Sequence, residues 1–283
     1  MPLVAHLSDP HFGAERPEVV DDILRCLHLL RPDVVVLSGD ITQRARAGEF
    51  RRAREFVDRL PPCKRLILPG NHDLPLNLLS RLLWPLGRFR NTFGSQLEPS
   101  LDTPELLVIC VNTTRAWRHK HGVVSPAQIA HVADRLRQGP PEQLKVVVTH
   151  QPAAVSRELD EPDRLRGGPR AVQAWREAGA DLILGGHIHL PYMLPVLAEP
   201  PESGRGPVWV VNAGTAVSRR VRYEAGNSFN LIRSLHTNDL GERLCTVERW
   251  DHQPGQGFTP TRVHELDLPG APHMAREPAR ATG

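Results

Sequence analysis

The sequence has few cysteines and no long apolar run. Four cysteines in 283 residues, with no CxxC pair among them, are too scattered for a disulfide framework or a zinc-thiolate site. We therefore expect reduced thiols and a cytoplasmic protein. No stretch of about 18 apolar residues is present, and no basic segment precedes an apolar one at the amino terminus, so we expect neither a membrane span nor a secretion signal.

An excess of charge of one sign is also missing, because 35 basic and 32 acidic residues leave a formal net charge of +3. Nucleic-acid-binding domains usually show a strong basic excess or a basic stripe with interleaved aromatic residues. Aromatic residues make up only 5% of this chain. The composition therefore gives no support to a nucleic-acid partner.

Five short apolar runs, each followed at once by aspartate, asparagine or histidine, dominate the first two thirds of the chain. Runs of valine, isoleucine and leucine bounded by glycine, proline or serine predict buried strands. Ligands of open α/β sheets bind beyond the carboxyl ends of the strands, so we expect these polar residues to meet in one site. The runs are 3–11, 33–40, 65–73, 145–150 and 181–189.

Helical periodicity fills most of the intervals between these runs. It predicts helices over 15–30, 49–60, 126–138 and 168–178. Strands that alternate with helices indicate a parallel sheet covered by helices. The mixed apolar and basic segment 74–101 predicts helix and loop over one edge of the site.

After residue 189 the pattern changes to short apolar runs without long helices, which favours an antiparallel or mixed second sheet. These strands are expected over 193–197, 208–213, 229–235 and 245–250. From residue 253 the chain is rich in proline and glycine and loses periodicity. We therefore expect one domain over residues 1–252 and an extended tail over 253–283.

The polar residues behind the apolar runs are oxygen and nitrogen ligands. Such a set suits manganese, iron or zinc in a catalytic site better than a structural cysteine site. On strands, the two-residue spacing within Asp9–His11 and His187–His189 would point both side chains to one side. The candidates are too many for one catalytic ion and suit two ions that share a carboxylate: Asp9, His11, Asp40, Asn71, His150, His187 and His189.

Each of these residues alone has an ordinary explanation. A single histidine at the end of a strand is usually a surface or satisfied histidine, and a Gly-Asp or Asn-His-Asp sequence is usually a turn. Five apolar runs that all end in this way are hard to explain as independent turns. We therefore favour a metal site for the whole set.

Taken in order, the motifs resemble those of the calcineurin-like metallophosphoesterase superfamily: Asp9-Pro-His11, Gly39-Asp40, Gly70-Asn71-His72-Asp73, His150 and Gly186-His187-Ile188-His189. Among its members, the sequence is most similar to bacterial class III cyclic nucleotide phosphodiesterases and glycerophosphodiesterases. The resemblance implies an α/β fold, a four-layer αββα sandwich of two mixed β-sheets flanked by helices. It also implies two metal ions at the strand ends, Mn²⁺, Fe²⁺/Fe³⁺ or Zn²⁺.

The resemblance also implies roles for the motif residues. Asp9, His11 and His189 would bind one ion. Asn71, His150 and His187 would bind the other, and Asp40 would bridge the two. His72 would stabilise the transition state or protonate the leaving oxygen, and Asp73 would orient its neighbours. Gln151 stands where many bacterial members have a second histidine, which puts the surroundings of His150 in doubt.

The implied reaction is hydrolysis of a phosphodiester by a hydroxide that bridges the two ions. The expected substrate is a small molecule, such as a cyclic nucleotide or a glycerophosphodiester. Arg220, Arg222, Arg44 and Asn212 are candidates for substrate binding, because a guanidinium group matches phosphate geometry and Asn212 ends a predicted strand. Asn112 is a candidate neighbour of the metal ligands.

Two other functions stay open. A DNA nuclease of the Mre11 and SbcD branch shares these motifs and often has His-Gln where this chain has His150-Gln151. That branch carries additional capping and coiled-coil-associated segments, for which 283 residues leave little room. A non-enzymatic scaffold such as the retromer subunit Vps29 would lose active-site histidines, which are all present here. The sequence leaves open whether the second sheet or the tail pairs subunits into an oligomer.

Overall fold

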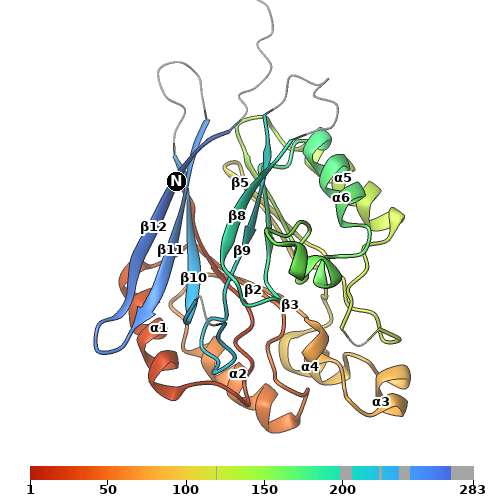
Figure 1. The fold of residues 1–283 in the computed structure, drawn as a ribbon, viewed down its shortest axis with the longest axis vertical. Coiled ribbons are helices and arrows are strands. Elements are labelled where there is room, and N and C mark those ends of the chain that lie inside the picture. Colours follow the sequence, from red (N-terminus) through yellow and green to blue (C-terminus); the bar gives the residue numbers. More distant parts are fainter. Residues whose placement is uncertain (119, 198–205, 223–224, 236–242, 269–283) are drawn as a thin grey trace, which may run out of the picture.

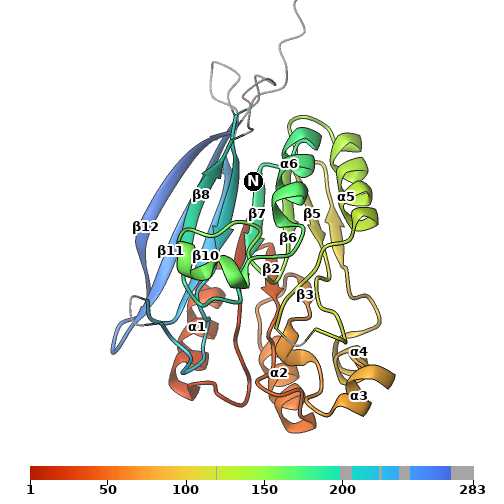
Figure 2. The same ribbon diagram turned by 45° about the vertical axis from the view of Figure 1, so that its right-hand side comes forward.

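Two six-stranded β-sheets pack face to face, and helices cover the outer face of each (Figure 1 and Figure 2). The computed structural model describes residues 1–118, 120–197, 206–222, 225–235 and 243–268. This arrangement confirms the predicted α/β class and the four-layer αββα sandwich with two mixed sheets.

The first sheet has the strand order β12-β11-β10-β1-β2-β3. Its parallel part places the carboxyl ends of β1, β2 and β3 at one edge, and the remaining strands are antiparallel. The strands are β1 (Leu3–Leu7), β2 (Val34–Ser38), β3 (Lys64–Leu68), β10 (Ser228–Leu235), β11 (Arg243–Gln253) and β12 (Gly257–Leu268).

The second sheet has the order β4-β5-β6-β7-β9-β8. Its four central strands are parallel, whereas β4 and β8 run antiparallel to their neighbours at the two edges. The strands are β4 (Ser100–Asp102), β5 (Leu106–Cys110), β6 (Leu144–Val148), β7 (Leu182–Gly185), β8 (Tyr192–Val196) and β9 (Val208–Asn212).

The four predicted helices are present, with small differences at their ends. They are α1 (Pro17–Leu30) and α2 (Ala47–Asp58), which pack on the first sheet, and α5 (Pro126–Gln138) and α6 (Gly168–Ala178), which pack on the second. Two short helices, α3 (Leu78–Leu83) and α4 (Gly87–Phe93), follow β3. No helix in the described ranges is long and apolar enough to cross a membrane.

Alternation along the strands explains how one sheet packs on two sides. On β1, Ala5 and Leu7 pack beneath the helices, while Val4 faces the second sheet. On β6, Val147 packs beneath helices and Val146 faces the first sheet. Successive side chains of a strand point to opposite faces, so a continuous apolar run is needed where both faces are buried. This double burial fixes the sheets rigidly at the edge where the polar loops begin.

The extended tail predicted from residue 253 is wrong for residues 257–268, which form β12. This strand pairs with β11, and Phe258, Leu266 and Leu268 on it are buried. Pro260 made a strand look unlikely in the sequence. A proline is tolerated on an edge strand, however, and Pro260 lies where the pairing register with β11 shifts. The rest of the predicted tail, 269–283, lies outside the described residues.

The change of pattern after residue 189 had suggested that the late strands form a sheet of their own. They do not. Strands β8 and β9 complete the sheet of β5, β6 and β7, whereas β10, β11 and β12 complete the sheet of β1, β2 and β3. The carboxyl-terminal part of the chain therefore contributes strands to both sheets.

Candidate metal centre

All seven predicted ligands lie beyond the carboxyl ends of β1, β2, β3, β6 and β7, six of them in loops and Asn71 at the start of the 3-10 helix η1 (Asn71–Asp73). The strands stop short of them, since β1 ends at Leu7 and β7 at Gly185. The argument that Asp9 and His11 share one side of a strand is therefore wrong. The loops, and not the strand pleat, aim these side chains into a common site.

The backbone of these loops is held in an unusual conformation. Positive φ is uncommon for residues other than glycine, and such residues cluster at functional sites. Of the seven non-glycine residues with positive φ in the described part of the chain, five are predicted ligands. These are Asp9 at 51°, His11 at 44°, Asp40 at 48°, His187 at 69° and His189 at 54°.

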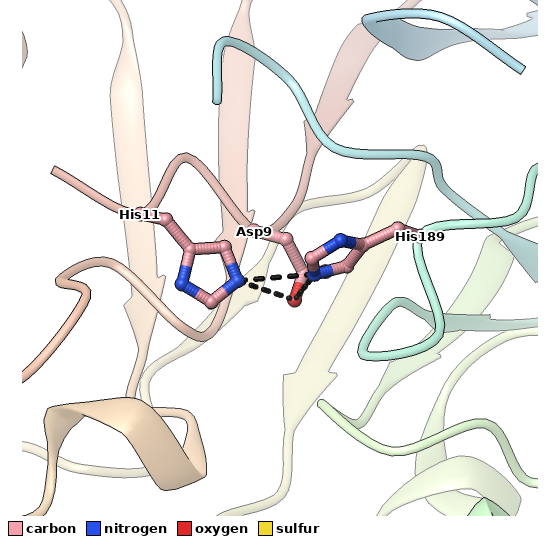
Figure 3. Close-up of side chains that lie close together, drawn as sticks. All are labelled: Asp9, His11 and His189. Carbon is pink, nitrogen blue, oxygen red and sulfur yellow. Dashed lines mark hydrogen bonds and ion pairs between the residues drawn. The ribbon is translucent and has the colours of Figure 1, made fainter. Parts of the chain in front are cut away.

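The first group of side chains consists of Asp9, His11 and His189, all buried (Figure 3). The Nε2 atoms of the two histidines are 3.0 Å apart. Asp9 Oδ1 lies 3.6 Å from His11 Nε2 and 3.2 Å from His189 Nε2. Three ligand atoms that converge in this way from two different sheets can hold one metal ion.

The second group consists of Asp40, His150 and His187, whose ligand atoms also lie within 4.8 Å of one another. Asp40 Oδ1 is 3.2 Å from His150 Nε2. Asn71 is buried and lines the same cavity as Asp40 and His187. The structure thus brings together the residues predicted for the second ion.

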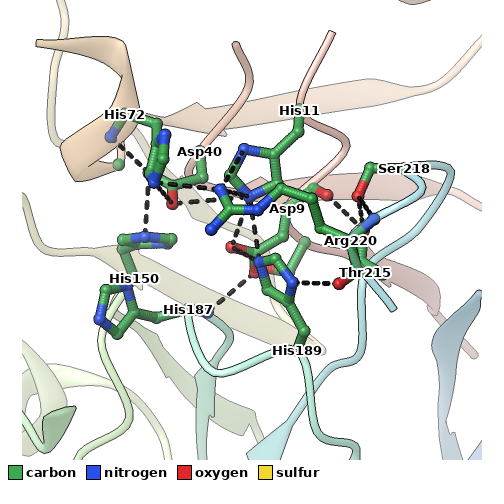
Figure 4. A network of polar contacts seen from close by, with 12 residues as sticks. Asp9, His11, Asp40, His72, His150, His187, His189, Thr215, Ser218 and Arg220 are labelled. Carbon is green, nitrogen blue, oxygen red and sulfur yellow. Dashed lines mark hydrogen bonds and ion pairs between the residues drawn. The ribbon is translucent and has the colours of Figure 1, made fainter. Parts of the chain in front are cut away.

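Asp40 lies between the two groups (Figure 4). Its Oδ1 faces His150, while its Oδ2 is 3.7 Å from His11 Nε2 in the first group. A carboxylate has two oxygens and can therefore serve two ions at once. The family resemblance implies a bridging role for Asp40, and this placement brings its two oxygens next to both groups.

Backbone carbonyl groups orient the histidine rings. His150 Nδ1 is 2.8 Å from the Ser38 carbonyl oxygen, and His189 Nδ1 is 2.5 Å from that of Arg220. A carbonyl oxygen only accepts, so each Nδ1 carries the hydrogen and donates it. The lone pair of each neutral ring is therefore on Nε2, the atom that faces the site.

Two glycines allow the loops to approach this closely. A Cβ atom on Gly70 would collide with the backbone nitrogen of Asp40. A Cβ atom on Gly186 would collide with the side chains of Ser8 and Asp9. Any side chain at either position would push a ligand-bearing loop out of place.

Asp73 fixes the loop that carries Asp40. Its carboxylate is buried and accepts hydrogen bonds from the backbone N–H groups of Ile41 at 3.1 Å, Thr42 at 2.8 Å and Gly70 at 2.9 Å. Burial, together with the nearby charge of Asp40, raises the pKa of Asp73 to about 6. These contacts support the predicted orienting role.

The buried carboxylates of the site are stabilised by a nearby positive charge. Burial would raise the pKa of Asp40, but the neighbouring His150 holds that pKa well below its usual range. Burial would lower the pKa of His150, but the charge of Asp40 raises it to about 9. Burial and His150 together lower the pKa of His187 to about 3. Without a metal ion, a proton on His150 therefore offsets the charge of Asp40.

The residues fit a pair of metal ions, because several buried atoms of the site have no hydrogen-bond partner within the part of the chain that the structure describes. They include Asp9 Oδ1, His150 Nε2 and His187 Nδ1. Buried polar atoms are normally hydrogen-bonded, so unpaired oxygen and nitrogen atoms gathered around one point are typical of a ligand set. The mixture of carboxylate, amide and imidazole groups suits borderline metals without selecting one.

We expect metal binding to release about one proton per chain at pH 7, because a metal ion must displace the proton on His150. With a pKa of about 9 for His150, the apparent metal affinity should fall by up to about tenfold per pH unit as the pH drops below that value. Calorimetric titration in two buffers of different ionisation enthalpy measures the released protons. Metal binding with no proton release would contradict the charge state assigned to His150.

A cavity of about 380 Å³ opens above the ligand groups. Two of the predicted substrate-binding residues, Arg220 and Arg222, line it together with His72. The other lining residues are Asp40, Asn71, Lys120, Asp163, His187, Ile188 and His189. The cavity therefore places three basic side chains, Lys120, Arg220 and Arg222, next to both ligand groups.

The structure does not bring the other predicted substrate residues into the cavity. Arg44 has an exposed side chain, and it is not among the residues that line the cavity. Asn212 is buried, and its Nδ2 donates to the Leu190 carbonyl oxygen at 2.8 Å. Asn212 therefore braces the loop that follows His189. Asn112 bonds within its own loop, where its Oδ1 accepts from Thr114.

Two charged residues of the cavity were missed by sequence reasoning. Lys120 and Asp163 line the cavity and form an ion pair of 2.6 Å between Nζ and Oδ1. Lys120 lies in an irregular segment and Asp163 ends the short 3-10 helix η2 (Glu158–Asp163), so no periodicity marked them. Gln151 is buried, and its Nε2 donates to Asn71 Oδ1 at 3.4 Å. The sequence had already marked Gln151 as the departure from the family pattern beside His150, and the structure places it next to the candidate ligand Asn71.

A double-sheet sandwich with two ligand groups joined by one aspartate is the arrangement of a metallophosphoesterase. The family model described as calcineurin-like phosphoesterase matches residues 2–191. The chain belongs to this family.

Two curated relatives and one solved structure show how far the similarity extends. The chain is 26% identical over 181 residues to the glycerophosphodiester phosphodiesterase GpdQ of Enterobacter lignolyticus, which covers 60% of this chain and 64% of the relative. It is 24% identical over 207 residues to a cAMP/cGMP dual specificity phosphodiesterase of Mycobacterium tuberculosis, which covers 66% of this chain and 61% of the relative. The chain thus spans less than two thirds of the length of either relative.

The solved structure is a purple acid phosphatase from seeds of yellow lupin, Lupinus luteus. It superposes with a TM-score of 0.69 over 95% of this chain and 54% of its own, at 13% identity. At this identity the likeness bears on the fold alone. The curated relatives agree with the branch that the sequence motifs resemble.

Proposed function

We propose that this protein is a dinuclear-metal phosphodiesterase that hydrolyses a small-molecule phosphodiester. The observation that carries the proposal is Asp40, whose two oxygens face two converging ligand groups at the floor of one cavity. Two bound ions would supply a hydroxide-like nucleophile near neutral pH and neutralise charge on the phosphoryl group. Both curated relatives are named as phosphodiesterases, which supports the diester class.

The assignment of ligands to the two ions follows the two groups. Asp9, His11 and His189 would hold one ion, and Asn71, His150 and His187 would hold the other. Asp40 would be shared between them. The support is the convergence of each group within 4.8 Å, and for Asn71 its burial beside the second group.

His72 is placed to act on the leaving oxygen. Its Nδ1 donates to the Gln43 carbonyl oxygen at 2.7 Å, so Nε2 is the nitrogen that faces the cavity. Its backbone N–H donates to Asp40 Oδ1 at 2.7 Å, which ties the position of the ring to the shared carboxylate. When protonated, Nε2 can donate a proton to an oxygen that leaves the phosphorus.

Arg220 is placed to bind the phosphoryl oxygens. Its guanidinium group lies between His11 and His72 (Figure 4), with Nη1 3.1 Å from His72 Nε2. The Arg220 carbonyl oxygen also accepts from His189 Nδ1, so the same residue orients a ligand. A guanidinium group presents paired donors that match the oxygens of a phosphate.

Replacing Arg220 with alanine should lower kcat/KM for a diester by about 10- to 100-fold, because a hydrogen bond to a charged group contributes about 1.5–3 kcal/mol. Arg220→Lys should recover part of the loss through its charge. Arg219→Ala is the matched control, because Arg219 is exposed and does not line the cavity. Steady-state kinetics and metal content check the prediction, and equal losses in both alanine variants would contradict it.

The balance of charge in the cavity supports a small substrate over DNA. Lys120 pairs with Asp163, and Arg222 Nη1 lies 2.9 Å from Asp160 Oδ1, so acidic groups offset two of the three basic side chains. A volume of about 380 Å³ suits a small molecule. A nucleic-acid groove would instead present an uncompensated basic track.

A substrate panel tests the proposed function. Manganese-loaded protein would be assayed with bis-p-nitrophenyl phosphate, p-nitrophenyl phosphate, cyclic AMP, glycerophosphocholine and single-stranded DNA. We expect the small diesters to be hydrolysed faster than the monoester, and DNA to be left intact. Cleavage of DNA above the small diesters would overturn the small-molecule proposal in favour of a nuclease.

A further inference from the structure

Helix α3 exposes almost all of its apolar side chains. The segment 76–84, here termed the leucine patch, carries six large apolar residues with exposed fractions between 54% and 75%. They are Leu76, Leu78, Leu79, Leu82, Leu83 and Trp84. Helix α3, all of which the structure describes, contains no buried residue. A surface helix normally buries its apolar face, so an exposed one marks a binding surface.

The leucines of the patch share one face. At about 100° per residue, Leu78, Leu79, Leu82 and Leu83 fall within an arc of about 140°, with Arg81 on the opposite side. The Asn77 side chain caps the helix by accepting from the Ser80 N–H at 3.1 Å. Figure 1 shows α3 beside α4, outside both sheets. The patch is therefore a formed amphipathic turn presented to the surroundings.

The segment that carries the patch has charged residues of one sign. Between Asp73 and Glu98 the sequence contains no acidic residue and three arginines, Arg81, Arg88 and Arg90. Arg88 and Arg90 are exposed. Arg81 is half-buried on the side of α3 away from the leucines, and Arg88 Nη1 donates to the Ala45 carbonyl oxygen at 2.9 Å, so the arginines add positive charge to the segment without surrounding its apolar face. An apolar face on a positively charged segment is the combination that binds anionic membrane surfaces.

We propose that the leucine patch docks the protein on an anionic membrane surface. A lipid interface accepts the leucines, suits Trp84 at the boundary between headgroups and acyl chains, and neutralises the arginines. A second copy of the chain is a poorer partner. A two-fold contact through the patch would bring both sets of arginines together with no acidic residue of the same segment to offset them.

The docked mode is peripheral. Helix α3 has six residues, far fewer than the ~20 that a spanning helix requires. The patch begins at Leu76, only three residues after Asp73. The membrane surface would therefore be in contact with the segment that directly continues the loop of Asn71 and His72.

Vesicle sedimentation of the full chain tests the proposal. The probes are vesicles of phosphatidylcholine alone and of an equimolar mixture of phosphatidylcholine and phosphatidylglycerol. We expect binding to the anionic vesicles, and binding should weaken as salt rises. The variant Leu79→Ser/Leu82→Ser/Leu83→Ser should lower the partition coefficient at least about tenfold, because three apolar side chains no longer enter the interface.

The control variant is Leu29→Ser/Leu159→Ser, since these leucines are exposed at 81% and 79% away from the patch. It should bind vesicles as the unaltered protein does. Neither variant removes a buried side chain, so the melting temperature of each should stay unchanged. Absence of vesicle binding, or equal binding to both kinds of vesicle, would overturn the proposal. A dimer in analytical ultracentrifugation that the patch variant dissociates would also overturn it.

Discussion

Replacing Asp40 with asparagine is expected to reduce the metal content to one ion or none per chain and to lower diester hydrolysis by at least about 10³-fold. The oxygens of Asp40 face both ligand groups, at 3.2 Å from His150 and 3.7 Å from His11. The change keeps the shape of the side chain and removes its charge. Elemental analysis and steady-state kinetics would measure the two effects.

The matched control for this variant is Asp134→Asn, because Asp134 is an exposed carboxylate on α5. It should retain full metal content and activity. The substitution breaks the buried ion pair with His150, so the metal-free Asp40 variant should be less stable than the unaltered protein, and circular dichroism would verify that it is folded. Retention of two ions and of normal turnover in the Asp40 variant would contradict the shared role of this residue.

Replacing His72 with alanine is expected to lower turnover by about 10²- to 10⁴-fold while leaving the metal content intact. The ring is held by the Gln43 carbonyl oxygen, and its Nε2 faces the cavity next to Arg220. Removal of the ring therefore takes away a proton donor or a group that stabilises the transition state. Kinetics together with elemental analysis separates this role from metal binding.

Metal content has to be measured beside the kinetics, because ligand atoms of His11, Asp40 and His72 also lie within 4.8 Å of one another and His72 could itself bind an ion. Loss of a metal ion in His72→Ala would move His72 into the ligand set and refute the assigned role. His28→Ala serves as the control, since His28 is exposed on α1 and bonds only the Arg59 carbonyl oxygen in the described contacts. It should leave both kinetics and metal content unchanged.

Most of the fold could be predicted, because strands that are buried on both faces need continuous apolar sequences, which are easy to recognise. Continuous apolar runs such as 34–37 and 146–148 have no other common explanation when helices separate them. The strand β12 escaped prediction for a physical reason. It lies at an edge, where one side is exposed and Pro260 is tolerated, so its pattern resembles that of a tail.

The ligands of the site could be predicted as a set, because each follows an apolar run. Their precise placement could not, because it depends on loops in which Asp40 and His189 take positive φ. The substrate residues were harder still. Arg220 reaches the cavity through a long flexible side chain, whereas the side chain of Arg44, of the same type, stays exposed outside it. Residue type alone does not distinguish these two arginines.

The most direct test of the account is a titration of metal-stripped protein with Mn²⁺, followed at each step by bound metal and by hydrolysis of bis-p-nitrophenyl phosphate. We expect no turnover in the stripped protein, and we expect activity to rise only as the second ion per chain is bound. Full activity without metal, or with a single ion per chain, would contradict a dinuclear centre built around Asp40.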